Sequence, residues 1–133
     1  MKEMSVREFV FQYVTETYKA KPEYLWARFP EDAIFRHADN RKWFALVMRI
    51  RYDKLEAGRE GMIDILNVKL DDPLLRDLLV QQEGYYVGYH ISRGNWISIV
   101  LDGTVPTEEI TRLIGISYTV TAPKPKKQTK KTI

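Results

Sequence analysis

The hydrophobic residues of this chain recur with two different periods, and the two periods divide it into helices and strands. Apolar side chains at three- and four-residue spacing predict three amphipathic helices. These segments are residues 6–18, 74–79 and 110–118. Stretches rich in aromatic and β-branched side chains predict five strands. These segments are residues 33–37, 43–51, 63–70, 85–91 and 96–102.

The order of these elements, α-β-β-β-α-β-β-α, indicates the fold class. Strands joined by short connections pair antiparallel, and amphipathic helices cover one face of such a sheet. We therefore predict a two-layer α+β fold with a five-stranded antiparallel sheet and helices packed on one face. Capping signals support two helix starts, because Ser5 and Glu8 have the spacing of a capping box and Asp72 precedes Pro73.

Alternation along the predicted strands separates a core face of the sheet from a mixed face. We assign the more apolar set of each strand to the core. In the second to fifth strands these residues are Phe44, Leu46, Met48 and Ile50; Leu66, Val68 and Leu70; Val87, Tyr89 and Ile91; and Ile97, Ile99 and Leu101. Gly88 lies between Tyr86 and His90, which predicts a close approach of backbone or a bulge at that point.

The opposite, mixed face combines aromatic rings with cations, and we take it as the candidate binding face. Its residues are Arg36, Trp43, Arg49, Arg51, Asn67, Lys69, Tyr86, His90 and Trp96. Such a surface can stack nucleic-acid bases and hold phosphates. It can equally receive an aromatic or apolar anchor from a protein or peptide. A third interpretation is that the loop 56–61 or the C-terminal tail covers this face, with His90 and Trp96 merely packed.

The charge of the chain is concentrated near its C-terminus. The net charge is +3, but five lysines lie within residues 124–131, and without them residues 1–122 hold 16 basic and 18 acidic side chains. We predict a single domain over residues 1–122 and a disordered Lys/Pro-rich tail over 123–133. Residues 36–59 carry seven basic and three acidic side chains, so one edge of the sheet is expected to be positive.

Several function classes lack their signals in this sequence. The chain has no cysteine, no apolar stretch of about 20 residues, and no catalytic or nucleotide-binding motif. Its two histidines, His37 and His90, have no spacing typical of a metal site. We therefore expect a cytoplasmic, non-catalytic protein with no cofactor, no metal and no membrane segment.

Four segments together resemble a known family. They read RFPEDAIFRHADNRKWFALVMRI, DILNVKLDDPLLRDLL, GYYVGYHISRGNWISIVLDGTVPTEEI and SYTV. In content and order they are similar to the MmcQ/YjbR family of small bacterial proteins. The family often has Asn-Lys-X-His-Trp after the GYH strand, where this chain has Ser92-Arg93-Gly94-Asn95-Trp96, so a role for that histidine is not expected here.

The resemblance implies both a fold and a function. It implies the strand order 1-2-5-4-3, as in a CyaY-like fold that is also similar to type III secretion chaperones. It implies DNA binding, which we expect to be weak and strongly salt-dependent because the cations are few. The alternative is a chaperone-like module for a protein or peptide partner, with the chain a monomer or a homodimer.

Overall fold

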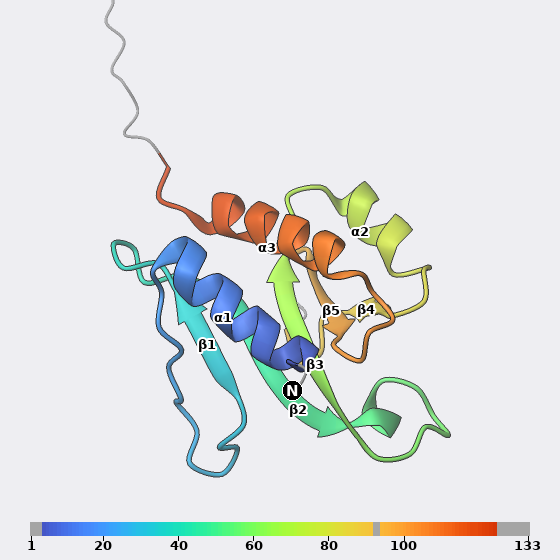
Figure 1. The fold of residues 1–133 in the computed structure, drawn as a ribbon. Coiled ribbons are helices and arrows are strands. Elements are labelled where there is room, and N and C mark those ends of the chain that lie inside the picture. Colours follow the sequence, from blue (N-terminus) through green and yellow to red (C-terminus); the bar gives the residue numbers. More distant parts are fainter. Residues whose placement is uncertain (1–3, 92–93, 125–133) are drawn as a thin grey trace, which may run out of the picture.

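The computed structural model describes residues 4–91 and 94–124, and Figure 1 shows helices α1 and α3 lying across the same face of a sheet. The helices are α1 (Val6–Tyr18), α2 (Pro73–Leu79) and α3 (Thr107–Thr121), with a short 3-10 helix η1 (Tyr52–Lys54). The strands are β1 (Ala33–Arg36), β2 (Trp43–Arg51), β3 (Met62–Lys69), β4 (Tyr85–Val87) and β5 (Trp96–Val100). The α+β class and the antiparallel sheet are confirmed. Ser92, Arg93 and the tail after Lys124 lie outside the described residues.

The strand order is β1-β2-β3-β5-β4, so the predicted order 1-2-5-4-3 is wrong. Strands β2 and β3 are joined by a short connection through η1, and they pair along most of their length, from Arg51 opposite Met62 to Leu46 opposite Asn67. This local pairing puts β3 at the centre of the sheet and moves β5 to its far side. Strand β4 then forms the edge.

A β-bulge reverses the faces that we predicted for β2. Phe35 is opposite Ala45 whereas Arg36 is opposite Trp43, so Phe44 is an extra residue in β2. Phe44 and Ala45 therefore both belong to the main core under the helices. Beyond the bulge, the side chains that we had assigned to this core lie on the opposite, open face of the sheet. They are Leu46, Met48 and Ile50.

Strand β4 is shorter than predicted, and its last residues change direction. It ends at Val87, whose side chain is 65% exposed rather than buried. His90 has a left-handed backbone (φ 59°), so the chain turns back over the open face and Tyr89 packs there against the Ile65 cluster. The assignment of Val87, Tyr89 and Ile91 to the core is therefore wrong. The core faces predicted for β3 and β5 are confirmed by Leu66, Val68, Ile97 and Ile99.

The helices begin where the capping residues predict. The Ser5 hydroxyl accepts a hydrogen bond from the Glu8 N–H, and the Glu8 carboxylate accepts one from the Ser5 N–H. Asp72 caps α2, and the apolar stripe predicted for that helix, Leu74, Leu75, Leu78 and Leu79, is half right. Leu75 and Leu79 pack against the core, whereas Leu74 and Leu78 are exposed. Among the described residues, no helix has both the length and the apolarity needed to cross a membrane.

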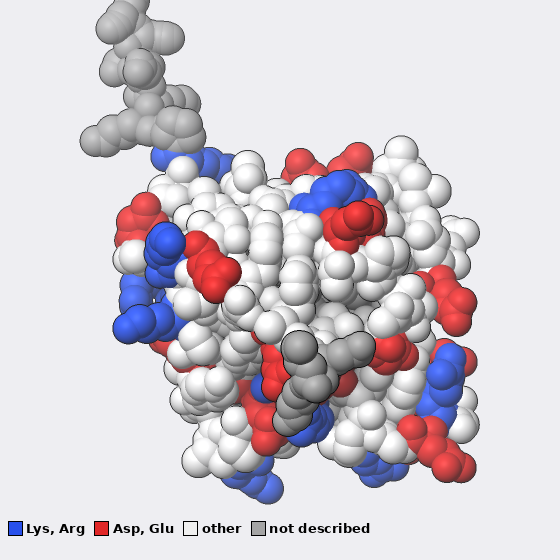
Figure 2. All heavy atoms as spheres, viewed as in Figure 1, with Lys and Arg blue, Asp and Glu red and all other residues white. Residues whose placement is uncertain are grey.

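The helix-bearing face is unevenly charged. Figure 2 shows a broad uncharged area over the helices and a gathering of basic side chains at its left edge, beside the C-terminal end of α1. Helix α3 is tied to the sheet at its centre by Ser117, whose hydroxyl donates to the Phe44 carbonyl and accepts from the Lys69 N–H. The sheet surface under these helices is therefore covered, and the candidate binding face of the sheet is the other one.

Candidate functional site

A groove of about 560 Å³ runs over the open face of β2. Its floor is made by Leu46, Met48 and Ile50, which the bulge turns away from the helices. Side chains two residues apart along a strand are about 7 Å apart, so the floor offers a row of apolar positions roughly 13 Å long. The floor exists because three apolar side chains of one strand face away from the main core.

Two irregular segments form the walls of the groove. On the β1 side lie Trp26 and Phe29, and the rings of Trp26 and Trp43 meet edge to face with centroids 5.9 Å apart. On the other side lie Tyr89 and His90, whose rings are 4.1 Å apart. The Phe29 side chain is 56% exposed, so an aromatic surface is already in solvent at the mouth of the groove.

A buried polar chain holds the second wall in place. The Tyr89 N–H donates to the Ser98 hydroxyl, at 2.9 Å, and that hydroxyl donates to the Asn67 side-chain carbonyl. The Asn67 amide in turn donates to the Met48 sulfur at 3.5 Å. Asn67 and Ser98 are completely buried, so Asn67, which we predicted to bind a ligand, instead supports the wall.

Ion pairs neutralise most of the predicted cations of this face. Arg36 pairs with Glu23 at 2.6 Å, Arg51 with Asp53 at 2.6 Å, and Arg59 with Glu56 at 3.4 Å. The hydrogen bond from Arg36 lowers the pKa of the Glu23 carboxyl, which keeps this pair ionised. Arg36 lies on the edge strand β1 and does not line the groove. The positive charge that the sequence predicts near β1 and β2 is therefore partly compensated.

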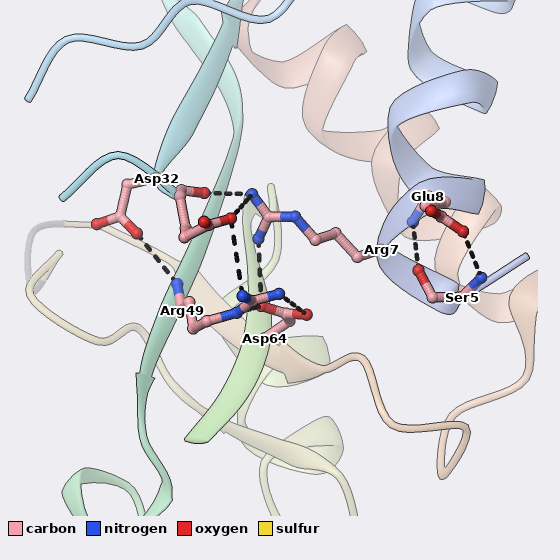
Figure 3. Close-up of polar contacts among 7 residues, drawn as sticks. Ser5, Arg7, Glu8, Asp32, Arg49 and Asp64 are labelled. Atoms are coloured by element: carbon pink, nitrogen blue, oxygen red, sulfur yellow. Dashed lines mark hydrogen bonds and ion pairs between the residues drawn. The ribbon is translucent and has the colours of Figure 1, made fainter.

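A larger charge network anchors the first wall to the sheet (Figure 3). Arg7 on α1 and Arg49 on β2 both bind Asp64 of β3, at 3.2 and 2.9 Å. Arg7 also donates to the Glu31 carbonyl, and Arg49 lies 3.7 Å from the Glu31 carboxylate. Because Glu31 belongs to the segment that carries Trp26 and Phe29, the network fixes this segment relative to β2 and β3.

The remaining residues that we predicted for the binding face divide between the groove lining and positions outside it. Tyr86 donates its hydroxyl to Glu56 at 2.9 Å, which ties down the loop 56–61, and burial together with this bond raises the Tyr86 pKa. Lys69 and Trp96 are half-buried cross-strand neighbours on the open face, outside the groove lining. Trp43, Arg49, Arg51 and His90 do line it.

The two histidines lie on opposite sides of the sheet. His37 packs between Phe44 and Tyr118 on the helix side, and its Nε2 lies 2.9 Å from the Thr121 hydroxyl. Burial lowers the pKa of His37. His90 lines the groove on the open side. The two rings are therefore too far apart, with the sheet between them, to share a metal ion.

Sequence reasoning missed most of the groove. The missed lining residues are Trp26, Phe29, Asp32, Leu46, Met48, Ile50, Lys54, Met62, Tyr89 and Ile91. The aromatic content of the proline-bounded segment 22–32 was a signal for part of it. We interpreted that segment only as a loop with Trp26 at the edge of the core. Nothing in the alternation of β2 indicates the bulge that supplies the floor.

Comparison with known proteins places this chain in a family. The family model described as YjbR matches residues 15–120. The uncharacterized protein YyaQ of Bacillus subtilis is 42% identical over 118 residues, covering 89% of this chain and 99% of its own length.

Solved structures are also similar to this one. A crystal structure of a Pseudomonas syringae protein has a TM-score of 0.83 at 34% identity and covers 87% of this chain and 98% of its own. A Deinococcus radiodurans protein shares the fold, with a TM-score of 0.67 at 21% identity, over 94% of this chain and 84% of its own. On its sequence and its family match, the chain belongs to the YjbR family.

Proposed function

We propose that this chain is a non-catalytic binding protein whose open-face groove takes an apolar segment of another protein. The observation that carries the proposal is the apolar floor of β2 between two walls of aromatic side chains. Ligand sites are typically apolar clefts with a few polar groups, and exposed aromatic anchors dominate many protein interfaces. The groove combines both features.

The dimensions and side chains of the groove favour a peptide segment. A floor of three alternating apolar positions matches two or three anchors of an extended or helical chain. Met48 in the floor and Met62 at its end add adaptable surface, and Met62 is 58% exposed. Such a groove accepts related apolar side chains without demanding a single sequence.

The charges of this face weigh against phosphate as its ligand. Arg49, Arg51 and Lys54 line the groove, but the two arginines each already have a carboxylate partner within 3 Å. A nucleic acid would have to compete with these carboxylates for the guanidinium groups. We therefore favour the protein-binding alternative for the open face over the DNA binding that the resemblance implies.

The substitution Phe29→Glu tests this proposal. Peptides selected from a random library on the full-length protein should lose at least about tenfold in affinity, about 1.4 kcal/mol, when a charge is placed in the wall. Leu74→Glu is the matched control, because Leu74 is an exposed apolar residue on α2 and does not line the groove. Titration calorimetry gives the dissociation constants.

Two outcomes would count against a peptide groove. One is that the library yields no binder. The other is that the selected peptides lose affinity equally with Phe29→Glu and Leu74→Glu, which would indicate contact with apolar surface in general.

A second candidate function, nucleic-acid binding, is favoured at a different place. A hollow of about 360 Å³ beside the C-terminal end of α1 is lined by Lys19, Lys21, Arg36 and Arg41, against Glu23 and Asp39. The basic side chains at the left edge of Figure 2 lie in this region. Helix α3 ends beside it, because Asn40 donates to the Thr121 carbonyl, and Lys124 follows three residues later in the sequence. Clustered cations of this kind hold phosphate backbones without reading sequence.

Reversing the charge of two residues that line the hollow distinguishes nucleic-acid binding there from peptide binding in the groove. In the full chain, Lys21→Glu with Arg41→Glu should weaken binding to labelled duplex DNA at least about tenfold. The slope of the logarithm of the binding constant against the logarithm of the salt concentration should become shallower by about one for each lost phosphate contact. The pair Arg28→Glu with Arg76→Glu changes the net charge equally and lies outside both the hollow and the groove. Fluorescence anisotropy at two salt concentrations measures both. Equal losses in the two double variants would mean that only net charge matters.

A further inference from the structure

Asp32 is a buried carboxylate in the lining of the groove. It is 4% exposed, directly before β1, and its Oδ1 accepts a hydrogen bond from the Arg49 N–H at 3.0 Å. Its other oxygen, Oδ2, accepts no hydrogen bond from the residues that the structure describes. Among those residues, every fully buried side-chain oxygen or nitrogen has a partner. Oδ2 is therefore not fully buried, and Asp32 is one of the residues that line the groove.

Within the residues that the structure describes, the neighbouring cations form no ion pair with this carboxylate. Arg7 and Arg49 direct their guanidinium groups at Asp64 and Glu31, and within the described part of the chain neither forms an ion pair with Asp32. In Figure 3 the free oxygen of Asp32 points away from that network. A buried anion without a cationic partner is costly unless another group neutralises it.

We infer that Asp32 binds a positively charged side chain, a lysine ammonium or an arginine guanidinium, on the apolar segment that occupies the groove. The inference rests on the proposed function, because it names the polar feature of the same ligand. The aromatic walls suit the same chemistry, since the faces of tryptophan and phenylalanine rings attract cations. The ligand is thus an apolar peptide with one basic residue among its anchors.

The electrostatics around Asp32 agree with this assignment. Burial raises the pKa of the Asp32 carboxyl, and the nearby Glu31 and Asp64 carboxylates add to the increase. The Arg49 N–H and the charge of Arg7 act in the opposite direction and only partly offset it. A ligand cation at Oδ2 would stabilise the ionised form, so binding and ionisation favour each other.

Three indole compounds isolate the charge from the apolar body. Tryptamine carries an ammonium group, N-acetyltryptamine is neutral and indole-3-propionate is negative. We expect the full-length protein to bind tryptamine at least about tenfold more tightly than the other two. Amide chemical-shift changes give the affinities and report which residues contact the probe.

The variant Asp32→Asn keeps an oxygen for the Arg49 N–H and removes the charge. It should bind tryptamine and N-acetyltryptamine equally, with its affinity for the neutral compound unchanged. Asp77→Asn, an exposed carboxylate on α2, is the control and should retain the preference for tryptamine.

The possible failures are distinguishable. If the groove residues respond to indoles without preferring tryptamine, or if Asp32→Asn keeps the preference, the role of Asp32 is refuted and the groove stands. If no indole shifts the groove residues at all, both the inference and the groove as a binding site are refuted.

Discussion

Replacing Phe44 by alanine is expected to lower the free energy of unfolding by about 3–5 kcal/mol, the cost of deleting a fully buried aromatic ring. The ring has no solvent exposure, and its neighbours come from both layers. Its centroid lies 5.6 Å from that of Tyr18 on α1 and 4.8 Å from that of Tyr118 on α3. His37 is 5.2 Å away, so the cavity would lie where both helices meet the sheet.

The neighbouring residue provides the control. Trp43 is adjacent in sequence, but it lies on the open face and is only half-buried. Trp43→Ala should cost about 1 kcal/mol, near the average for point substitutions. Urea unfolding followed by circular dichroism measures both variants. Equal losses for Phe44→Ala and Trp43→Ala would show that the bulge does not place Phe44 in the main core.

Local signals in the sequence predicted the helices and strands well. The bulge shows why they did not equally predict which face of the sheet each strand residue occupies. Helix starts depend on a few neighbouring residues, so the capping box at Ser5 and the cap at Asp72 were both correct. The face of a strand residue depends on every residue before it, because one extra residue inverts the alternation. The extra residue at Phe44 therefore turned the predicted core of β2 into the floor of the groove.

The groove also depends on contacts between distant segments. Trp26 and Phe29 reach it because Arg7 and Arg49 fix their segment through Glu31. Tyr89 reaches it because the chain turns at His90, a non-glycine residue in a left-handed conformation that no local rule predicts. Such placements follow from tertiary structure, so periodicity alone could not reveal them.

The net charge of one sequence segment is a poor guide to the charge of the folded surface for the same reason. The seven basic residues between 36 and 59 predicted a positive edge, but three of their ion-pair partners lie outside that segment. Glu23 pairs with Arg36 across the β1 edge, and Asp64 pairs with Arg49 across the β2–β3 hairpin. Among the described residues of this segment, Arg41 beside the second candidate site and Lys54 in the groove lining form no ion pair.

Replacing Gly88 by alanine is expected to destabilise the protein by about 2–3 kcal/mol and to disrupt the groove, because the added carbon collides with atoms that have little freedom to move. A Cβ at this position would lie 2.6 Å from the Ile91 carbonyl oxygen and 2.9 Å from the Trp96 Cβ. The sequence predicted a close approach at Gly88, and the structure confirms it. Relief of the collision requires the segment 88–91 to move away from β5.

That movement would break the support of one wall. The Tyr89 N–H would lose the Ser98 hydroxyl, and Tyr89, His90 and Ile91 would no longer line the groove. Peptides selected on the parent protein should then bind Gly88→Ala at least about tenfold more weakly. Urea unfolding and titration calorimetry measure the two effects separately.

Gly115→Ala is the matched control, and we expect it to raise stability where Gly88→Ala lowers it. Gly115 lies within α3, where a Cβ would make an ordinary contact at 3.5 Å with the Tyr18 hydroxyl. Gly115→Ala should therefore stabilise the protein by up to about 1 kcal/mol, through the higher helix propensity of alanine, and leave peptide binding unchanged. A Gly88→Ala variant as stable as the parent would mean that the segment 88–91 moves without cost. Retained peptide binding in that variant would mean that the ligand does not contact this wall, which would confine the site to the β2 floor and to the side that carries Trp26 and Phe29.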